Sequence, residues 1–372
     1  MTFNKKLSLS LLSALLVLAG CSGSTSSNNN TTSQNLQPLA FSTPYNKPRV
    51  MSNFNDYVLF LKDKALAEGV SKSVLAAQNN IQYMPKAVAL DQAQAGRSKR
   101  DPSQPPIINP NATTNYLNKV LTSAKVDTAV ERYDEVCVPL QQASRKYGVQ
   151  QEYLLALWGM ESSFGYYQGS YDVLSALATL AFDGRREGLF AREFINAMKM
   201  LQQDHIQRHK MLGSWAGAMG QTQFMPSSFL SYAADGNGDG LKDIWSNQFD
   251  VFASIANYLH TVGWDDKLPW GVEVTLSEPI SYSLSGIEKA KSRSLSQWQS
   301  MGVGLKSFTA ENQEKLTALA NAELWLVMPD REAGRIFLVS NNFRTILDWN
   351  KSNYFAISIG MFADRIKEET GL

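Results

Sequence analysis

The sequence is poor in cysteine and histidine. Its 372 residues include two cysteines, Cys21 and Cys137, and three histidines. These are too few for a zinc site with four Cys/His ligands or for a framework of disulfides. Catalytic chemistry must therefore come mainly from carboxylates, hydroxyl groups and aromatic side chains.

The sequence also lacks an excess of charge of either sign. It has 35 Lys and Arg against 34 Asp and Glu, a net charge of +1 at pH 7, so nothing favours nucleic acid as a partner. No internal repeat of about 20 to 50 residues is present, which argues against a solenoid. With 44% hydrophobic and 10% aromatic residues, the chain has enough apolar surface for one large or two smaller cores.

No hydrophobic run reaches the roughly 20 residues that a spanning helix needs. The amino end has Lys5 and Lys6, then an apolar run over 7–18, then Leu-Ala-Gly before Cys21. This order is typical of a secretory signal over residues 1–20, although a short membrane anchor or a buried helix would share the apolar run. The ending at Cys21 resembles bacterial lipoprotein precursors, and the resemblance implies cleavage before Cys21 and lipidation of its thiol.

A polar tether follows the lipidated cysteine over residues 21–50. Residues 22–35 are all Ser, Thr, Asn, Gly or Gln, a composition that cannot bury a core. Ser22, in place of Asp after the cysteine, suggests sorting to the outer membrane. We therefore expect an outer-membrane lipoprotein that faces the periplasm and touches the membrane only through its lipid. Cys137 would then be a lone thiol in an oxidising compartment, and we expect it to be buried in the core.

The hydrophobic periodicity predicts an α+β protein that is mainly α. Strand-like alternation is confined to the part after Trp270, where a small sheet is expected over 272–276, 280–284, 322–328 and 335–340. Residues 96–110, rich in Pro, Ser and charge, indicate an exposed connection. Spacing of 3.6 residues predicts helices over 54–65, 116–121, 130–147, 152–160, 190–200, 249–262, 343–349 and 354–367.

Glu161 is the first candidate for catalysis. It closes an apolar helix whose buried face includes Leu154, Leu157 and Trp158. Removal of water from a carboxyl group raises its pKa, as a general acid at neutral pH requires. A Glu at a helix end is more often a solvated surface residue, so this pattern alone leaves both interpretations open.

Longer motifs resolve this choice. In chain order they are Glu161-Ser162-Ser163-Phe164-Gly165, 174–180 leading to Arg185-Arg186, 213–228, 256–259 with Gly263-Trp264, 341–344 and Trp349-Asn350. Together they resemble the lytic murein transglycosylase B family over about residues 51–370. The resemblance implies a lysozyme-like catalytic core over about 140–265. It also implies an additional helical region and a small β subdomain over about 270–340, all within one catalytic region, 51–372.

The family resemblance also implies the reaction. Lytic transglycosylases cleave the MurNAc-GlcNAc β-1,4 bond of peptidoglycan strands without water and leave a 1,6-anhydro sugar, in cell-wall remodelling and turnover. One carboxyl group, Glu161, would serve as acid and then as base, and no cofactor is needed for catalysis. Asp172 and Asp183 are the nearest downstream acids, and each is expected to cap a helix or to lie in a turn. A hydrolytic muramidase and a non-catalytic peptidoglycan-binding lipoprotein remain as alternatives, and we expect a monomer.

Motif positions suggest the residues that bind substrate. An arginine pair, Arg185 and Arg186, matches positions that face the stem peptide. Phe224 and Tyr258 could equally be core residues. Phe355 stands where family members often have Tyr, so a hydroxyl near Glu161 is either missing or supplied by the neighbouring Tyr354. The positions that match the saccharide cleft are Ser214, Gln223, Phe224, Tyr258 and Asn350.

An acidic loop over 235–241 indicates calcium. Asp235, Asn237 and Asp239 occupy positions 1, 3 and 5 of an EF-hand pattern, with Gly240 at position 6. Position 12 is Ser246, which has no carboxylate. The resemblance implies instead a longer loop closed by Asp250, with the Leu241 carbonyl as a further ligand. Such an ion would be structural, and a metal-free turn is the alternative.

Two other patterns are weaker. His205 and His209 lie four residues apart on an expected helix, but Ile206 follows His205 where a metalloprotease has Glu, so solvated histidines are expected. Ser214 is one place early for a nucleophile elbow.

Overall fold

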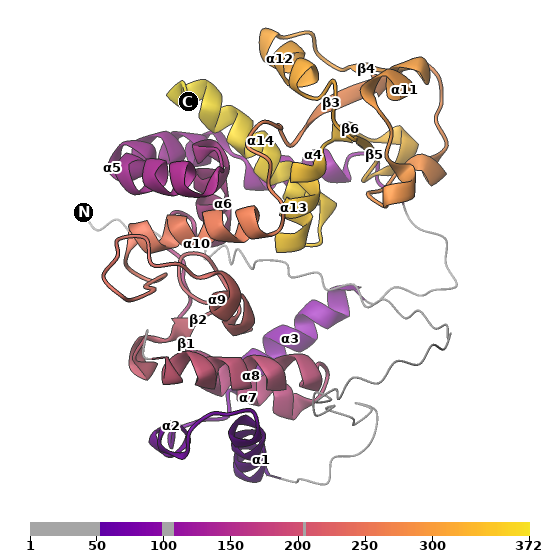
Figure 1. Cartoon of the computed structure of the whole chain (residues 1–372). Coiled ribbons are helices and arrows are strands. Elements are labelled where there is room, and N and C mark those ends of the chain that lie inside the picture. Colours follow the sequence, from indigo (N-terminus) through magenta and orange to yellow (C-terminus); the bar gives the residue numbers. More distant parts are fainter. Residues whose placement is uncertain (1–52, 99–107, 204–205) are drawn as a thin grey trace, which may run out of the picture.

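The structure, a computed structural model, describes residues 53–98, 108–203 and 206–372. The predicted signal, Cys21 and the tether lie outside the described residues. Figure 1 shows the helices in two groups with a small sheet at one end. None of the described helices is long and apolar enough to cross a membrane.

The larger helical group surrounds α6, Gln151–Ser162. α5 packs against α10 and α6, and α14 packs against α6, α5 and α13 (Figure 1). α5 begins where the Thr122 side chain accepts from Lys125 N, and it ends at Gly148, whose φ of 64° is left-handed. The other members are α4 (Ala112–Val120), α5 (Ser123–Tyr147), α10 (Gln248–Thr261), α13 (Asn341–Trp349) and α14 (Asn353–Thr370).

The second helical group is built on the pair α7 and α8. A short antiparallel pair, β1 (Tyr171–Asp172) with β2 (Leu212–Gly213), borders it. Asp172 caps α7 by accepting from Ser175 N and pairs with Arg208 at 2.8 Å, so the expectation of a capping role for this acid is confirmed. The helices are α1 (Phe54–Ala67), α2 (Lys72–Ala77), α3 (Pro85–Ser98), α7 (Val173–Asp183), α8 (Glu187–Gln202) and α9 (Pro226–Tyr232).

The small sheet separates two hydrophobic cores. It is antiparallel with strand order β4-β3-β6-β5 and registers such as Val272 opposite Leu338. In β6, Phe337 and Val339 pack into the large helical core, whereas Ile336 and Leu338 pack into a second cluster under α11 and α12. The elements are β3 (Gly271–Leu276), α11 (Leu295–Ser300), β4 (Val303–Leu305), α12 (Ala310–Ala318), β5 (Trp325–Val327) and β6 (Ile336–Val339).

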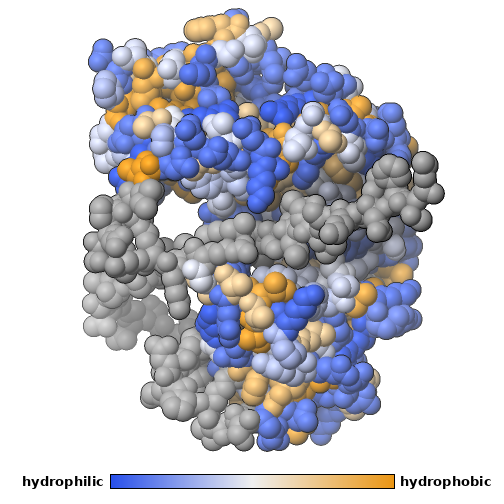
Figure 2. All heavy atoms as spheres, turned by 180° about the vertical axis from the view of Figure 1, so that it is seen from behind, coloured by the Kyte–Doolittle hydropathy of each residue, from blue (hydrophilic) through white to orange (hydrophobic). Residues whose placement is uncertain are grey.

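The part of one face that is visible in the space-filling view is largely polar. Figure 2 shows the face opposite to that of Figure 1 as mainly hydrophilic, with its hydrophobic residues in small separate patches. This agrees with a globular domain whose apolar residues are mostly buried in the two cores.

Four expectations need correction. Segment 280–284 is not a strand but contains the 3₁₀ turn η2 (Tyr282–Leu284), because its neighbours pair with one another in the sheet and leave it no partner. α3 continues through Gly96 to Ser98, so the connection begins later than expected, and residues 99–107 lie outside the described residues. Cys137 is only half-buried on α5, since it lies beside the exposed Val138 rather than on the core face. α8 ends at Gln202, so no helix carries both histidines; His209 lies in the 3₁₀ turn Arg208–Lys210, and His205 is outside the described residues.

Candidate functional site

α6 carries Glu161 into apolar surroundings. The helix is buried on nearly every side, and Leu154, Leu157 and Trp158 are at most 1% exposed. Glu161 lies in its last turn and is itself half-buried. A helix that is hydrophobic all round therefore presents one carboxylate at its end.

A strained turn fixes the end of this helix. Ser163 and Phe164 have positive φ values of 51° and 60°, a conformation that costs side-chain-bearing residues about 1 kcal/mol or more each. Phe164 folds back over Gly159, where an added Cβ would come within 2.6 Å of its ring. The Gln221 side chain accepts from Trp158 Nε1 at 2.7 Å and donates to Trp245 O at 2.9 Å, which joins α6 to the 213–224 segment.

Burial sets the electrostatics of Glu161. Loss of water raises its pKa to about 7, and two neighbours act in the opposite direction. Trp349 Nε1 donates to Glu161 Oε1 at 2.8 Å. The second is the ammonium group of Lys125, which donates to Gly159 O at 3.4 Å and lies 3.7 Å from Met160 Sδ. Glu161 can therefore hold a proton or release it near neutral pH.

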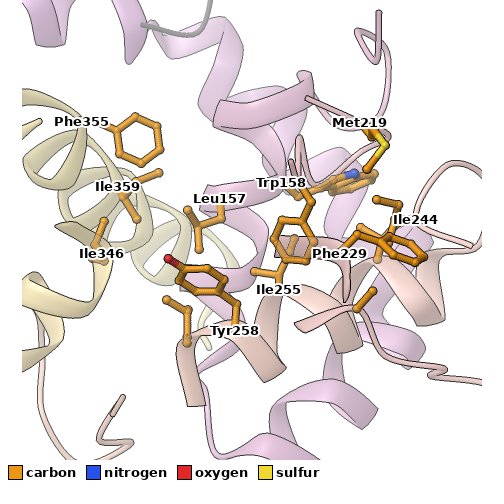
Figure 3. Packing of buried hydrophobic residues seen from close by; sticks show 14 of the residues in the cluster. Leu157, Trp158, Met219, Phe229, Ile244, Ile255, Tyr258, Ile346, Phe355 and Ile359 are labelled. Carbon is orange, nitrogen blue, oxygen red and sulfur yellow. The ribbon is translucent and has the colours of Figure 1, made fainter. Parts of the chain in front are cut away.

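An aromatic cluster adjoins the carboxylate. The Trp349 ring lies 4.7 Å from that of Tyr258 and 5.3 Å from that of Phe224, between ring centroids. Tyr258 and Phe224 are 9% and 3% exposed, and Figure 3 shows Tyr258 among core residues such as Leu157 and Ile346. The two predicted aromatic residues thus pack into the core and meet Glu161 through Trp349.

Ser214 and Gln223 lie in the 213–224 segment, which Gln221 joins to α6. The Ser214 hydroxyl accepts from Ala216 N and Ala218 N, which closes the turn. Gln223 has a φ of 51° and donates to Gly220 O at 2.8 Å. Asn350 caps the C-terminal end of α13, directly after Trp349, and its side chain accepts from Ser352 N. Asn350 is therefore next in the chain to the residue that bonds Glu161. The side chains of Ser214 and Gln223 bond backbone groups, those of Gln223 including Gln168 O at 3.3 Å.

The Tyr354 hydroxyl does not serve Glu161. It donates to Asp330 Oδ1 at 2.8 Å, so the expectation that it replaces the missing hydroxyl of Phe355 is wrong. The hydroxyl of Tyr116 on α4 does interact with Glu161. Burial raises the pKa of Tyr116 and the charge of Glu161 raises it further, while the Ser358 side chain forms a hydrogen bond with it. Tyr116, Lys125 and the direct bond from Trp349 were not predicted from the sequence, since their elements are distant from Glu161 in the chain.

The arginine pair already has a partner inside the protein. Arg185 and Arg186 both form ion pairs with Asp91 on α3, a carboxylate that is 1% exposed. The Arg186 guanidinium also lies 4.7 Å from the Phe190 ring. The charge of Asp183 also acts on Arg185, so two carboxylates balance the two guanidinium groups.

The acidic loop has the donor chemistry of a calcium site. Asp235 accepts from Gly238 N and Gly240 N. Asp250 accepts from Gly236 N and Asp243 N, which ties the loop to α10. Burial raises the pKa of Asp250, and the charges of Asp235 and Asp239 add to this, so a cation would relieve repulsion among three carboxylates. The described residues contain no preformed group of three or more His, Cys, Asp or Glu arranged to hold a metal.

Comparisons with known proteins agree with this geometry. The family model described as "Transglycosylase SLT domain" matches residues 53–364. Membrane-bound lytic murein transglycosylase B of Escherichia coli K12 is 30% identical over 261 residues, which are 69% of this chain and 68% of that protein.

Solved structures extend the likeness to most of the chain. SltB3 of Pseudomonas aeruginosa, in complex with NAG-anhNAM-pentapeptide, is 34% identical with a TM-score of 0.73, over 85% of this chain and 80% of that one. Escherichia coli Slt35 in complex with calcium is 25% identical with a TM-score of 0.67, over 85% and 94%. The lysozyme-like, mainly helical fold is therefore confirmed, and the chain belongs to the transglycosylase SLT domain family of lytic transglycosylases.

Proposed function

We propose that the chain cleaves the MurNAc-GlcNAc β-1,4 bond of peptidoglycan as a lytic transglycosylase, with Glu161 as its single acid and base. The observation that carries this proposal is a half-buried carboxyl group with a pKa of about 7 at the end of α6. Lys125 is the charged group that lowers this pKa, and the motif Glu161-Ser162-Ser163-Phe164-Gly165 contains no second carboxylate. Inverting and retaining glycoside hydrolases both need a second carboxylate, the first to activate water and the second as a nucleophile.

The reaction uses one carboxyl group twice. Protonated Glu161 donates to the glycosidic oxygen as the C1–O bond breaks, and the 2-acetamido group of MurNAc stabilises the positive charge at C1. Ionised Glu161 then removes the proton from the C6 hydroxyl, whose oxygen bonds to C1. The products are a free GlcNAc hydroxyl and a 1,6-anhydroMurNAc ring, and Glu161 is protonated again.

Substrate contacts follow from the surroundings of Glu161. In this proposal Trp349 faces the saccharide cleft, and Tyr258 and Phe224 support its ring from the core. Ser214, Gln223 and Asn350 offer amide and hydroxyl groups to the sugars. The guanidinium groups of Arg185 and Arg186 suit a stem-peptide carboxylate.

The place of action is proposed from the amino-terminal pattern. Lipidation at Cys21 would hold the catalytic region, 51–372, on the periplasmic face of the outer membrane, and the polar tether would let it reach peptidoglycan. The membrane-bound relative in Escherichia coli supports this part of the proposal.

A structural calcium ion is proposed for the acidic loop. Asp235, Asn237, Asp239, Asp250 and the Leu241 carbonyl are all oxygen donors, as calcium prefers. The calcium complex of the Escherichia coli relative Slt35 supports it. No chemical step depends on this ion.

Glu161→Gln tests the catalytic assignment, because the amide keeps the shape but cannot transfer the proton. We expect cleavage to fall at least a hundredfold, given acid-base contributions of about 10² to 10⁴, while binding of glycan strands survives. Wild-type binding without turnover would instead support a non-catalytic peptidoglycan-binding protein. Residual cleavage by the variant above about a hundredth of wild type would assign the chemistry to another group.

A further inference from the structure

A pocket of about 630 Å³ lies between the small sheet and α13. Its walls are η2, the segment 285–288, the residues that follow β5, and one side of α13 with the turn after it. Figure 1 shows α13 next to the β5–β6 end of the sheet. Residues of both cores line it, Val327 and Leu347 from the large core and Met328 from the small one.

Arg344 on α13 is the distinctive group in this wall. Its guanidinium lies 4.8 Å from the centre of the buried Trp325 ring, which fixes the plane of the group. Nη1 donates to Asn341 Oδ1 at 3.2 Å. In the part of the chain that the structure describes, no carboxylate pairs with Arg344, and Nε and Nη2 have no acceptor. A guanidinium edge with two parallel N–H donors matches a carboxylate.

The other charges of the pocket are already matched. Lys351 pairs with Asp348 at 2.6 Å. Lys291 pairs with Glu288 at 3.2 Å and donates to Ser285 O at 2.6 Å. These pairs leave one net positive charge, that of Arg344. Glu288 and Asp348 in the same wall disfavour a dianion such as phosphate and suit a singly charged carboxylate.

The pocket adjoins the catalytic site around the end of α13. Asp348, Lys351 and Asn353 line it, and they flank Trp349 and Asn350 in the chain. The charge of Asp348 also contributes to the raised pKa of Tyr258, which places it near the aromatic cluster. From Arg344 to Trp349 the helix rises about 7.5 Å. Five extended peptide residues span about 17 Å, so a stem peptide is long enough to reach from the catalytic site to Arg344.

We propose that this pocket binds a carboxylate of a peptidoglycan stem peptide through Arg344. The inference rests on the proposed function, because it takes the substrate to be peptide-bearing glycan. Arg185 and Arg186 lie in the other helical group and share Asp91. Arg344 therefore binds the stem peptide of one sugar, and Arg185 and Arg186 face the stem peptide of another sugar.

The test compares Arg344→Gln with wild type on two substrates. On glycan strands that carry stem peptides we expect KM to rise about tenfold with kcat unchanged. On strands freed of peptide by an amidase we expect no change. Lys289→Gln is the matched control, because it removes an exposed cation that pairs with Glu323 outside the pocket. Equal losses on both strands, or no loss on either, would overturn the inference.

A binding measurement separates this inference from the catalytic assignment. A synthetic stem pentapeptide is titrated into Glu161→Gln with and without Arg344→Gln, and we expect Arg344→Gln to weaken binding at least tenfold. Unchanged binding contradicts the pocket assignment while leaving the role of Glu161 intact. Because Arg344 packs on Trp325, Arg344→Lys provides a second variant that keeps the charge but not the fork, and an intermediate loss is expected from it. If Arg344→Lys weakens pentapeptide binding as much as Arg344→Gln does, at unchanged thermal stability, the site requires the two-donor guanidinium group. Wild-type binding by Arg344→Lys would contradict this requirement.

Discussion

The indole Nε1 of Trp349 and Oε1 of Glu161 lie 2.8 Å apart. An indole nitrogen can only donate, so it stabilises the ionised carboxylate more than the protonated one. The bond therefore favours the base form of Glu161, which the second half of the proposed reaction uses.

Removal of this donor should move the pH dependence of activity. Trp349→Phe keeps an aromatic ring beside Tyr258 but loses the N–H, so the pKa of Glu161 rises. We expect the pH-activity profile to shift to higher pH and activity at the wild-type optimum to fall about tenfold or more. An unshifted profile at unchanged thermal stability would contradict the role given to this bond.

Lys125 should act in the same direction through its charge. The half-buried ammonium group lowers the pKa of Glu161, so Lys125→Met, which keeps the length of the side chain, should raise it and shift the profile to higher pH. Lys119→Met, on the adjacent helix α4, is a control that removes a lysine without altering the contacts of Gly159 and Met160. If the pH-activity profile shifted equally in Lys125→Met and Lys119→Met, the overall charge of the protein, rather than the contact of Lys125, would set the profile.

Glu161 should make stability depend on pH. Its folded pKa of about 7 lies above its unfolded value, so the folded state holds the proton more tightly. Its ionisation destabilises the protein as pH rises from about 4.5 to 7, by up to about 3 kcal/mol above pH 7. Glu161→Gln should therefore match wild type in thermal melts at pH 4 and exceed it at pH 8. A gain that is the same at both values would mean that the carboxyl is not desolvated.

The turn after α6 should not tolerate a side chain at Gly159. An added Cβ meets the Phe164 ring at 2.6 Å, so Gly159→Ala should cost about 1 to 3 kcal/mol and also lower activity by displacing the turn. Gly96→Ala in α3 is the control, because nothing lies within 4 Å of its added Cβ. That variant should be about 0.5 to 1 kcal/mol more stable than wild type. Equal melting curves for the two variants would show that Phe164 yields freely.

The acidic loop should respond to calcium. An ion that binds the folded state alone at a hundred times its Kd contributes about 2.7 kcal/mol, so calcium should raise the melting temperature, and Asp239→Ala should remove the effect. Identical melts with calcium and with chelator would leave the loop as a metal-free turn closed by its own amides.

Sequence patterns predicted most helices and the small sheet, because 3.6-residue and two-residue periods record which face is buried. They predicted Glu161, since its apolar helix and its motif are local. Lys125, Tyr116 and the Trp349 bond were not predictable, because they come from α5, α4 and α13 and meet Glu161 only after folding. Two expectations were wrong for the same reason. The Tyr354 hydroxyl bonds Asp330 instead of lying beside Glu161, and β3 pairs with β6, which leaves segment 280–284 outside the sheet.

The product of digestion tests the central claim most directly. With Glu161 as the single acid and base, the C6 hydroxyl attacks C1, and each released muropeptide carries a 1,6-anhydro ring. Mass spectrometry should then show products about 18 Da, one ordinary water, lighter than those of hydrolysis, and digestion in ¹⁸O-labelled water should leave no label at C1. Reducing-end MurNAc with ¹⁸O at C1 as the main product would contradict the account and require a second carboxylate that activates water.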